Sequence, residues 1–259
     1  MNTLLVVVLV LAGVLALLWL GQRQLIYFPS TGFVPRDVEL RTSDGLTLGA
    51  TLVRPPPSGP DRRLAVLVAN GNGGDRTGRM PLAHDLAGRG FTVLLFDYRG
   101  YGGNPGSPSE AGLYRDIRAA YAHLTTLFPA ERIILFGESL GGALVTDLAA
   151  QSPVGGVVLR SPFTDLAAVG GRHYPFLPVR LLLRDKYPLI ETISRVPAPV
   201  IVILGSADSI VPPSLSREVA ARVPRLVGLV EVQGADHNDP ELFDGPQIID
   251  AVDRLAAEI

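Results

Sequence analysis

The segment Gly137-Glu138-Ser139-Leu140-Gly141 has the residue types and spacing of a serine nucleophile on a sharp turn. It follows the segment 132–136, which predicts a buried strand, and it precedes a helical segment that ends at about Gln151. A G-x-S-x-G turn in this context exposes the serine oxygen, and its glycines let the two backbones pass closely. We therefore predict that Ser139 is the nucleophile of an acyl transfer and that the amide of Leu140 donates to the oxyanion. The alternative is a turn of small residues that only joins strand to helix.

A serine hydroxyl is a weak nucleophile and needs a general base, which a third group must orient. With this turn, the acid and the histidine are expected to follow the serine in that order. His237 is the only histidine after the last predicted strand, and Asp208 follows the strand before it. We expect His237 to be the base and Asp208 to hold its imidazole in one tautomer, although Asp208 could instead cap the next helix. Asp236 and Asp239 are rivals for the acid, but Asp239 precedes Pro240 and is typical of a helix N-cap.

The glycine-rich loop 70–74 is the expected source of the second oxyanion donor, because it directly follows the apolar strand predicted at 64–69. Its glycines permit the unusual backbone that such a loop requires, and the amide of Asn72 is the best candidate for the donor. A plain turn is the alternative. The loop lacks the G-K-[ST] sequence of a phosphate-binding loop, which argues against nucleotide binding.

Strands and helices alternate along most of the chain, which predicts an α/β fold with a mostly parallel sheet and helices on both faces. Continuous apolar runs are typical of parallel strands that are buried on both faces. The first two strands flank the hairpin signal Ser43-Asp44-Gly45 and should form an antiparallel edge. The pattern predicts eight strands, at 36–42, 46–54, 64–69, 91–96, 132–136, 156–159, 199–204 and 228–232, and further helices at 80–88, 110–128, 213–222 and 240–258.

The segment 162–197 interrupts this alternation, since it contains no core strand and falls between two strands of the sheet. We expect it to form a short cap over the carboxyl edge of the sheet. Phe163, Tyr174 and Phe176 are candidate substrate-binding residues. Because arginines interrupt its apolar residues, the segment is either an ordinary packed cap or a surface that lies on an anionic membrane.

The segment 1–22 predicts a membrane-anchor helix, followed by one globular domain at 23–259. Residues 4–20 carry no charge, and a helix over residues 1–21 is roughly 30 Å long, the thickness of a bilayer core. A cleaved signal peptide is the alternative, although no basic residue precedes the apolar run. Arg23, Arg36 and Arg41 follow the span, which favours a cytoplasmic domain, and an extracytoplasmic domain stays open as the alternative.

Composition excludes several classes of function. The 259-residue chain has a formal net charge of -2 and no cysteine. Without a basic field, a nucleic-acid-binding function is not expected. Disulfides, thiolate metal sites and cysteine nucleophiles are excluded, and four histidines leave little material for a zinc site. The acyl transfer predicted above requires neither a metal nor an organic cofactor.

The motifs together resemble the α/β-hydrolase superfamily of serine hydrolases. Within it, the chain is similar to the membrane-anchored branch that contains α/β-hydrolase-domain depalmitoylases and related bacterial hydrolases. An apolar N-terminus followed by Gln24-Leu25-Ile26-Tyr27-Phe28-Pro29 is also typical of that branch. The resemblance covers essentially the whole chain, and it depends on Asp97-Tyr98-Arg99-Gly100-Tyr101-Gly102, Pro108-Ser109-Glu110-Ala111-Gly112-Leu113-Tyr114, the segment 137–142, Ser161-Pro162-Phe163-Thr164, and the segments 205–208 and 234–239.

The resemblance implies a catalytic triad of Ser139, Asp208 and His237, with the amides of Asn72 and Leu140 as oxyanion donors. The chain departs from the branch at one position of the oxyanion loop. The branch usually has His-Gly-Asn there, whereas this chain begins the motif with Asn70. Because the donor is a backbone amide, the substitution need not remove activity, but it bears on the hydrogen bonds that support the loop.

The residues and the resemblance favour a serine esterase or thioesterase that acts through an acyl-enzyme intermediate. The proximity of an anchor to lipid suggests acylglycerols, lysophospholipids or acylated proteins as substrates, which is an analogy rather than a deduction. The same triad also serves serine peptidases and carbon–carbon hydrolases. The alternative from another class is a catalytically silent, membrane-tethered binding protein on a hydrolase scaffold.

Overall fold

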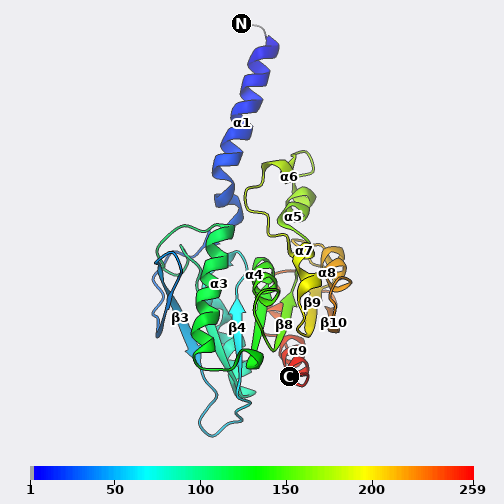
Figure 1. The fold of residues 1–259 in the computed structure, drawn as a ribbon. Coiled ribbons are helices and arrows are strands. Elements are labelled where there is room, and N and C mark those ends of the chain that lie inside the picture. The colour runs from blue at the N-terminus through cyan, green and yellow to red at the C-terminus, as the bar shows by residue number, and fades with distance from the viewer. Residues whose placement is uncertain (1–2) are drawn as a thin grey trace.

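The computed structural model describes residues 3–259, without the side chain of Leu11. Its body is an eight-stranded sheet with the order β10-β9-β8-β7-β4-β6-β3-β2 (Figure 1), which confirms the predicted mostly parallel α/β fold. Strands β2 and β3 form the predicted antiparallel edge. The strands are β2 (Val38–Arg41), β3 (Thr47–Val53), β4 (Leu64–Ala69), β6 (Phe91–Phe96), β7 (Ile133–Glu138), β8 (Gly156–Arg160), β9 (Val200–Gly205) and β10 (Leu226–Val232).

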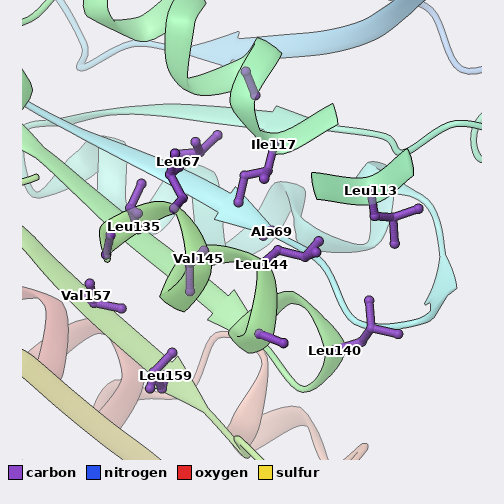
Figure 2. Packing of buried hydrophobic residues seen from close by; sticks show 14 of the residues in the cluster. Leu67, Ala69, Leu113, Ile117, Leu135, Leu140, Leu144, Val145, Val157 and Leu159 are labelled. Atoms are coloured by element: carbon purple, nitrogen blue, oxygen red, sulfur yellow. The ribbon is translucent and has the colours of Figure 1, made fainter. Parts of the chain in front are cut away.

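Two helical layers cover the sheet, and alternate residues of its strands point into them. One face packs against α3 (Glu110–Thr125), α4 (Leu140–Ala149) and α8 (Pro213–Ala220). Figure 2 shows part of this packing, where Leu67, Leu135 and Leu159 from neighbouring strands lie close to α4. The other face packs against α2 (Met80–Gly88) and α9 (Pro246–Ala256). Burial on both faces explains why the central strands are continuous apolar runs.

The last predicted helix, at 240–258, is wrong as a single element. The structure has a 3-10 turn, η4 (Pro240–Leu242), and then α9 begins at Pro246. Pro246 lacks an N–H and suits the first turn of a new helix, where that group would have no partner. At Gly245 any Cβ would collide with the backbone of Glu241, so the chain turns sharply there. Short 3-10 turns also occur at η1 (Arg76–Arg79), η2 (Ala130–Arg132) and η3 (Ile193–Arg195).

The segment 162–197 contains no strand and forms a cap of short helices, as its sequence predicts. These helices are α5 (Leu166–His173), α6 (Val179–Leu182) and α7 (Leu189–Thr192). In Figure 1, α5 and α6 stand at the end of the body from which α1 projects, while the C-terminus lies at the opposite end. The cap therefore lies beside the N-terminal helix.

The N-terminal helix α1 (Thr3–Ile26) continues four residues beyond the predicted anchor. Within residues 3–259, it is the one helix that is long and apolar enough to cross a membrane. After it, β1 (Phe28–Pro29) pairs in parallel with β5 (Gly73–Gly74) in a small second sheet that the sequence analysis did not anticipate. The end of α1 is thereby joined directly to the glycine-rich loop.

Candidate active site

Ser139 occupies a strained turn between β7 and α4. Its φ is 48° and its ψ is −112°, a left-handed conformation that residues other than glycine rarely adopt. Its backbone amide donates to the carbonyl oxygen of Arg160 at 2.8 Å, which ties the turn to β8. A Cβ at Gly141 would collide with the carbonyl group of Ala69, so a glycine is required where α4 passes the end of β4. The surrounding backbone thus holds the serine in place.

Asp208 and His237 follow β9 and β10 and form a buried pair. The ring nitrogen Nδ1 of His237 lies 2.7 Å from Oδ2 of Asp208. The other carboxylate oxygen accepts hydrogen bonds from the amides of Ile210 at 3.0 Å and Val211 at 2.7 Å, which fix the orientation of the carboxylate. Since Nδ1 is engaged, Nε2 is the ring nitrogen that can take a proton from a hydroxyl.

The two rival carboxylates have other partners. Oδ1 of Asp236 accepts hydrogen bonds from the backbone amides of Ser209 and His237, both at 2.7 Å, rather than from the imidazole. These amides hold the pKa of Asp236 below its usual value. Asp239 accepts from the amide of Asp236 at 2.8 Å and makes no capping hydrogen bond with its side chain. Of these three carboxylates, only Asp208 is bonded to the ring.

The sheet brings the three candidate residues to one edge. Ser139, Asp208 and His237 lie at the carboxyl ends of β7, β9 and β10. Together with β8, which lies between β7 and β9, these strands are successive neighbours in the parallel sheet. The hydroxyl of Ser139 makes no hydrogen bond to another residue of the described chain, and Ser139 lines the cavity at this edge. Catalytic hydrogen bonds are often long in the absence of substrate and tighten when it binds.

Several hydrogen bonds hold the glycine-rich loop at Asn72. Its side chain donates to the carbonyl oxygen of Ile26 at 2.7 Å, and its own carbonyl oxygen accepts from Phe28 N and the Tyr101 hydroxyl, each at 2.8 Å. The amide of Asn72 makes no backbone hydrogen bond within residues 3–259. The amide of Leu140, at the first position of α4, has no intrahelical partner. Both amides are thus available to donate to an oxyanion.

Asn70, where the similar branch usually has histidine, supports the loop through its backbone. Its carbonyl oxygen accepts a hydrogen bond of 2.6 Å from the Tyr98 hydroxyl. Its side-chain oxygen is buried and has no partner in the described part of the chain. In this chain the loop is therefore held at Asn70 by a backbone contact and not by the side-chain oxygen.

A buried ion pair beside Ser139 was missed from the sequence. Glu138 accepts hydrogen bonds from Arg79 Nε at 2.9 Å and Nη2 at 2.6 Å, and a longer one from the amide of Gly71 at 3.3 Å. Burial would raise the pKa of Glu138, but Arg79 and Arg160 outweigh it and hold the pKa below its usual value. The pair joins the nucleophile turn to the oxyanion loop. The available signal was the charge of Glu138 at the end of an otherwise apolar strand, because a buried charge needs a partner.

An apolar cavity of about 540 Å³ lies over this edge. Phe163 and Tyr174 line it together with Ser139, whereas Phe176 lies outside it. Phe176 is in the loop between α5 and α6, is 77% exposed and contacts Tyr174 edge-on, with ring centroids 6.4 Å apart. The cap supplies further lining residues, which include Leu166, Val169, His173, Leu177, Val179 and Leu183. Within residues 3–259, no group of three or more His, Asp or Glu side chains is placed to hold a metal ion.

Sequence comparisons relate the chain to α/β hydrolases. Residues 60–190 match the family described as "Serine aminopeptidase, S33". An uncharacterized protein of Mycobacterium tuberculosis strain H37Rv is 52% identical over 265 residues, which cover 98% of this chain and 93% of that protein. The human alpha/beta hydrolase domain-containing protein 17C is 36% identical over 207 residues, which cover 78% of this chain and 60% of that protein.

Solved structures agree with this relationship. The monoacylglycerol lipase of Paleococcus ferrophilus is 25% identical and superposes with a TM-score of 0.61, covering 82% of this chain and 99% of its own. An esterase of Pyrococcus furiosus superposes with a TM-score of 0.71 at 19% identity, covering 89% of this chain and 98% of its own. The second likeness concerns the fold alone.

Proposed function

Because the chain belongs to the α/β-hydrolase superfamily, we propose that it is a serine hydrolase of carboxylic esters or thioesters. The hydroxyl of Ser139 attacks the acyl carbon while Nε2 of His237 takes its proton, and Asp208 stabilises the imidazolium that forms. The amides of Asn72 and Leu140 donate to the developing oxyanion. Collapse of the tetrahedral intermediate expels the alcohol or thiol, which takes the proton back from His237. Water then attacks the acyl-enzyme by the same route and releases the acid.

One observation carries this proposal: a buried Asp208–His237 pair lies at the same sheet edge as a serine that lines an apolar cavity. The strained backbone of Ser139 supports the assignment, because such strain persists where the surrounding structure over-determines it and clusters at active sites. An acyl chain would lie against the apolar wall, with its carbonyl group near Ser139. The apolar lining of the cavity thus supports an acyl substrate.

The charge of the cavity favours acyl substrates over peptides with a free amino terminus. No Asp or Glu is among the residues that line it, and no Lys or Arg is either. A substrate ammonium group that enters such a pocket loses its hydration without gaining a partner, which is strongly unfavourable. An aminopeptidase would need a carboxylate at this position. The proposed substrates are therefore uncharged near the scissile bond.

We also propose that α1 anchors the enzyme in a membrane. Its length and composition suit a single span, and Trp19 near its end suits an interface. Arg23, Arg36 and Arg41 follow the span, which favours a cytoplasmic catalytic domain. Protease accessibility in intact and broken cells tests the sidedness. Digestion of the domain in intact cells would reverse this assignment.

The enzymatic proposal is tested with p-nitrophenyl esters and acyl thioesters of varied chain length. We expect the wild-type protein to hydrolyse them and Ser139→Ala to lose activity by ~10⁴-fold or more, with unchanged circular dichroism. Ser58→Ala, in an exposed loop, is the matched control and should retain full activity. If the folded wild-type protein hydrolyses nothing on the panel, or if Ser139→Ala stays active, the proposal is wrong. The first of these results would favour the silent binding protein.

A further inference from the structure

The end of α1 forms part of the wall of the active-site cavity. Leu18, Gln22, Leu25 and Ile26 line the same cavity as Ser139. An anchor that served only to tether the enzyme would have no reason to reach this site. The cavity is therefore bounded by the sheet edge at its base, by the cap on one side and by α1 on another.

Specific polar contacts fix α1 against the cap. Gln22 donates from Nε2 to the carbonyl oxygen of Leu182 at 3.1 Å and accepts at Oε1 from the amide of Arg184 at 2.7 Å. Arg23 forms a two-pronged ion pair with the buried Asp185, at 2.9 and 3.1 Å. All three cap residues lie in or just after α6. The last turns of α1 are thus part of the folded domain.

A membrane would meet the protein at this junction. A span requires roughly 17–25 apolar residues, so the apolar part of α1, residues 3–20, is needed almost whole and one bilayer surface falls near Trp19. Trp19 packs under the guanidinium of Arg184 at 4.7 Å, an arrangement suited to the interface between lipid and water. On the cap beside it, Phe176 is 77% exposed and Leu181 is 85% exposed. The part of the cavity that Leu18 and the cap line therefore lies near the level of the bilayer surface.

We propose that α1 is the acyl-binding wall of the enzyme as well as its anchor. A long, unbranched acyl chain of a membrane-resident ester or thioester passes from the bilayer between α1 and the cap, and it lies along Leu18 and Leu25 with its carbonyl group at Ser139. This inference rests on the proposed hydrolase function and adds the substrate class and the residues that select it. The chain moves from lipid to an apolar wall, so a long chain is accepted without the cost of burying unpaired polar groups of the protein.

Substitution of Leu18 by Trp tests the inference, because the larger side chain fills the space beside the chain. Leu17→Trp is the matched control: Leu17 is the adjacent residue, is 71% exposed and does not line the cavity. The full-length variants are reconstituted in phosphatidylcholine vesicles. The readout is kcat/KM for p-nitrophenyl butyrate and for p-nitrophenyl palmitate.

We expect Leu18→Trp to lower kcat/KM for the palmitate by tenfold or more and to change the value for the butyrate less than threefold. Leu17→Trp should leave both values unchanged. Palmitate hydrolysis that is equal in the two variants, or an equal loss on both esters in Leu18→Trp, would overturn the inference. If Leu18→Trp fails to fold, Leu25→Trp against the exposed Gln24→Trp is judged by the same criteria. Absence of Ser139-dependent butyrate hydrolysis in the wild type would instead disprove the underlying hydrolase function.

Discussion

The two ends of the proposed substrate path are built in different ways. At the sheet edge, Ser139 and the Asp208–His237 pair are held by backbone hydrogen bonds, a strained turn and the buried Arg79–Glu138 ion pair. At the other end, the cap and α1 meet through a few polar contacts around Asp185, and large apolar side chains are exposed there.

This difference indicates that the sheet edge carries out the chemistry, whereas the region of the cap and α1 selects the substrate. Catalytic groups must be positioned closely, and a parallel sheet provides a rigid frame for them. A surface that selects acyl chains needs apolar area rather than fixed geometry, because the hydrophobic effect has no direction. Substitutions at the sheet edge should therefore affect the turnover of every substrate. Substitutions near α1 should affect long chains and local stability.

The largest effect is expected from Asp208→Asn, which keeps the shape of the side chain but removes the charge that orients His237. The imidazole is then no longer held in the required tautomer, and kcat for short esters should fall by ~10⁴-fold with the fold unchanged. Asp236→Asn is the comparison, since that carboxylate bonds the backbone of the same loop but not the ring. We expect it to lose about tenfold or less. A loss of kcat in Asp236→Asn that exceeds the loss in Asp208→Asn would reverse the assignment of the acid.

The next effect is a loss of stability in Arg79→Gln, which leaves Glu138 buried without its main partner. Removing one member of a buried ion pair costs about 3–5 kcal/mol, which urea unfolding in detergent would measure. Arg115→Gln, which breaks a more exposed contact with Asp44, should cost about 1 kcal/mol or less. Equal losses of unfolding free energy in the two variants would mean that the buried and the more exposed ion pair contribute alike to stability.

The pH dependence of Arg79→Gln follows from the lowered pKa of Glu138. In the wild type, the ionised carboxylate stabilises the fold above about pH 4.3, and that contribution is lost as pH falls through the lower folded-state pKa. In the variant, fewer favourable contacts offset the burial of the Glu138 carboxylate. Its ionised form therefore destabilises the fold at neutral pH, and protonation of the carboxylate relieves this destabilisation. The difference in unfolding free energy between the two proteins should therefore shrink from pH 7 to pH 4.5. A difference that stays constant would exclude Glu138 as its source.

A smaller and local effect is expected from Asp185→Asn at the junction of α1 and the cap. The buried Asp185 accepts hydrogen bonds from Arg23 and from the Tyr27 hydroxyl, so the neutral amide weakens both contacts. We expect amide hydrogen exchange in the segment 178–190 to become about tenfold faster, corresponding to ~1.4 kcal/mol. Exchange at β7 should not change, and hydrolysis of short esters should stay within threefold. Faster exchange in both regions would mean that they are one cooperative unit.

Local sequence patterns predicted most of the fold and the main candidates for the site. Apolar runs such as 64–69 and 91–96 match whole strands, because burial on both faces excludes polar residues from them. The order of Ser139, Asp208 and His237 along the chain placed them after the strands where they are found.

The features that no sequence pattern predicted depend on contacts between distant segments. Arg79 and Glu138 are 59 residues apart, and neither belongs to a motif that names the other. The pairing of Phe28 with Gly73 and the approach of Leu18 to the cavity likewise leave no periodic signal. For Phe176, an aromatic residue in the cap suggested the pocket, but residue type does not reveal which way a loop side chain points. The structure leaves it exposed.

Labelling with a fluorophosphonate probe, followed by intact-mass analysis and peptide mapping, shows whether Ser139 is an activated nucleophile. The probe reacts with a serine only when a base and an oxyanion hole activate that hydroxyl. We predict one adduct per molecule, located on Ser139, absent from Ser139→Ala and slow to form in Asp208→Asn. A folded wild-type protein that gains no adduct, or one that is modified at another residue, would show that Ser139 is not the nucleophile.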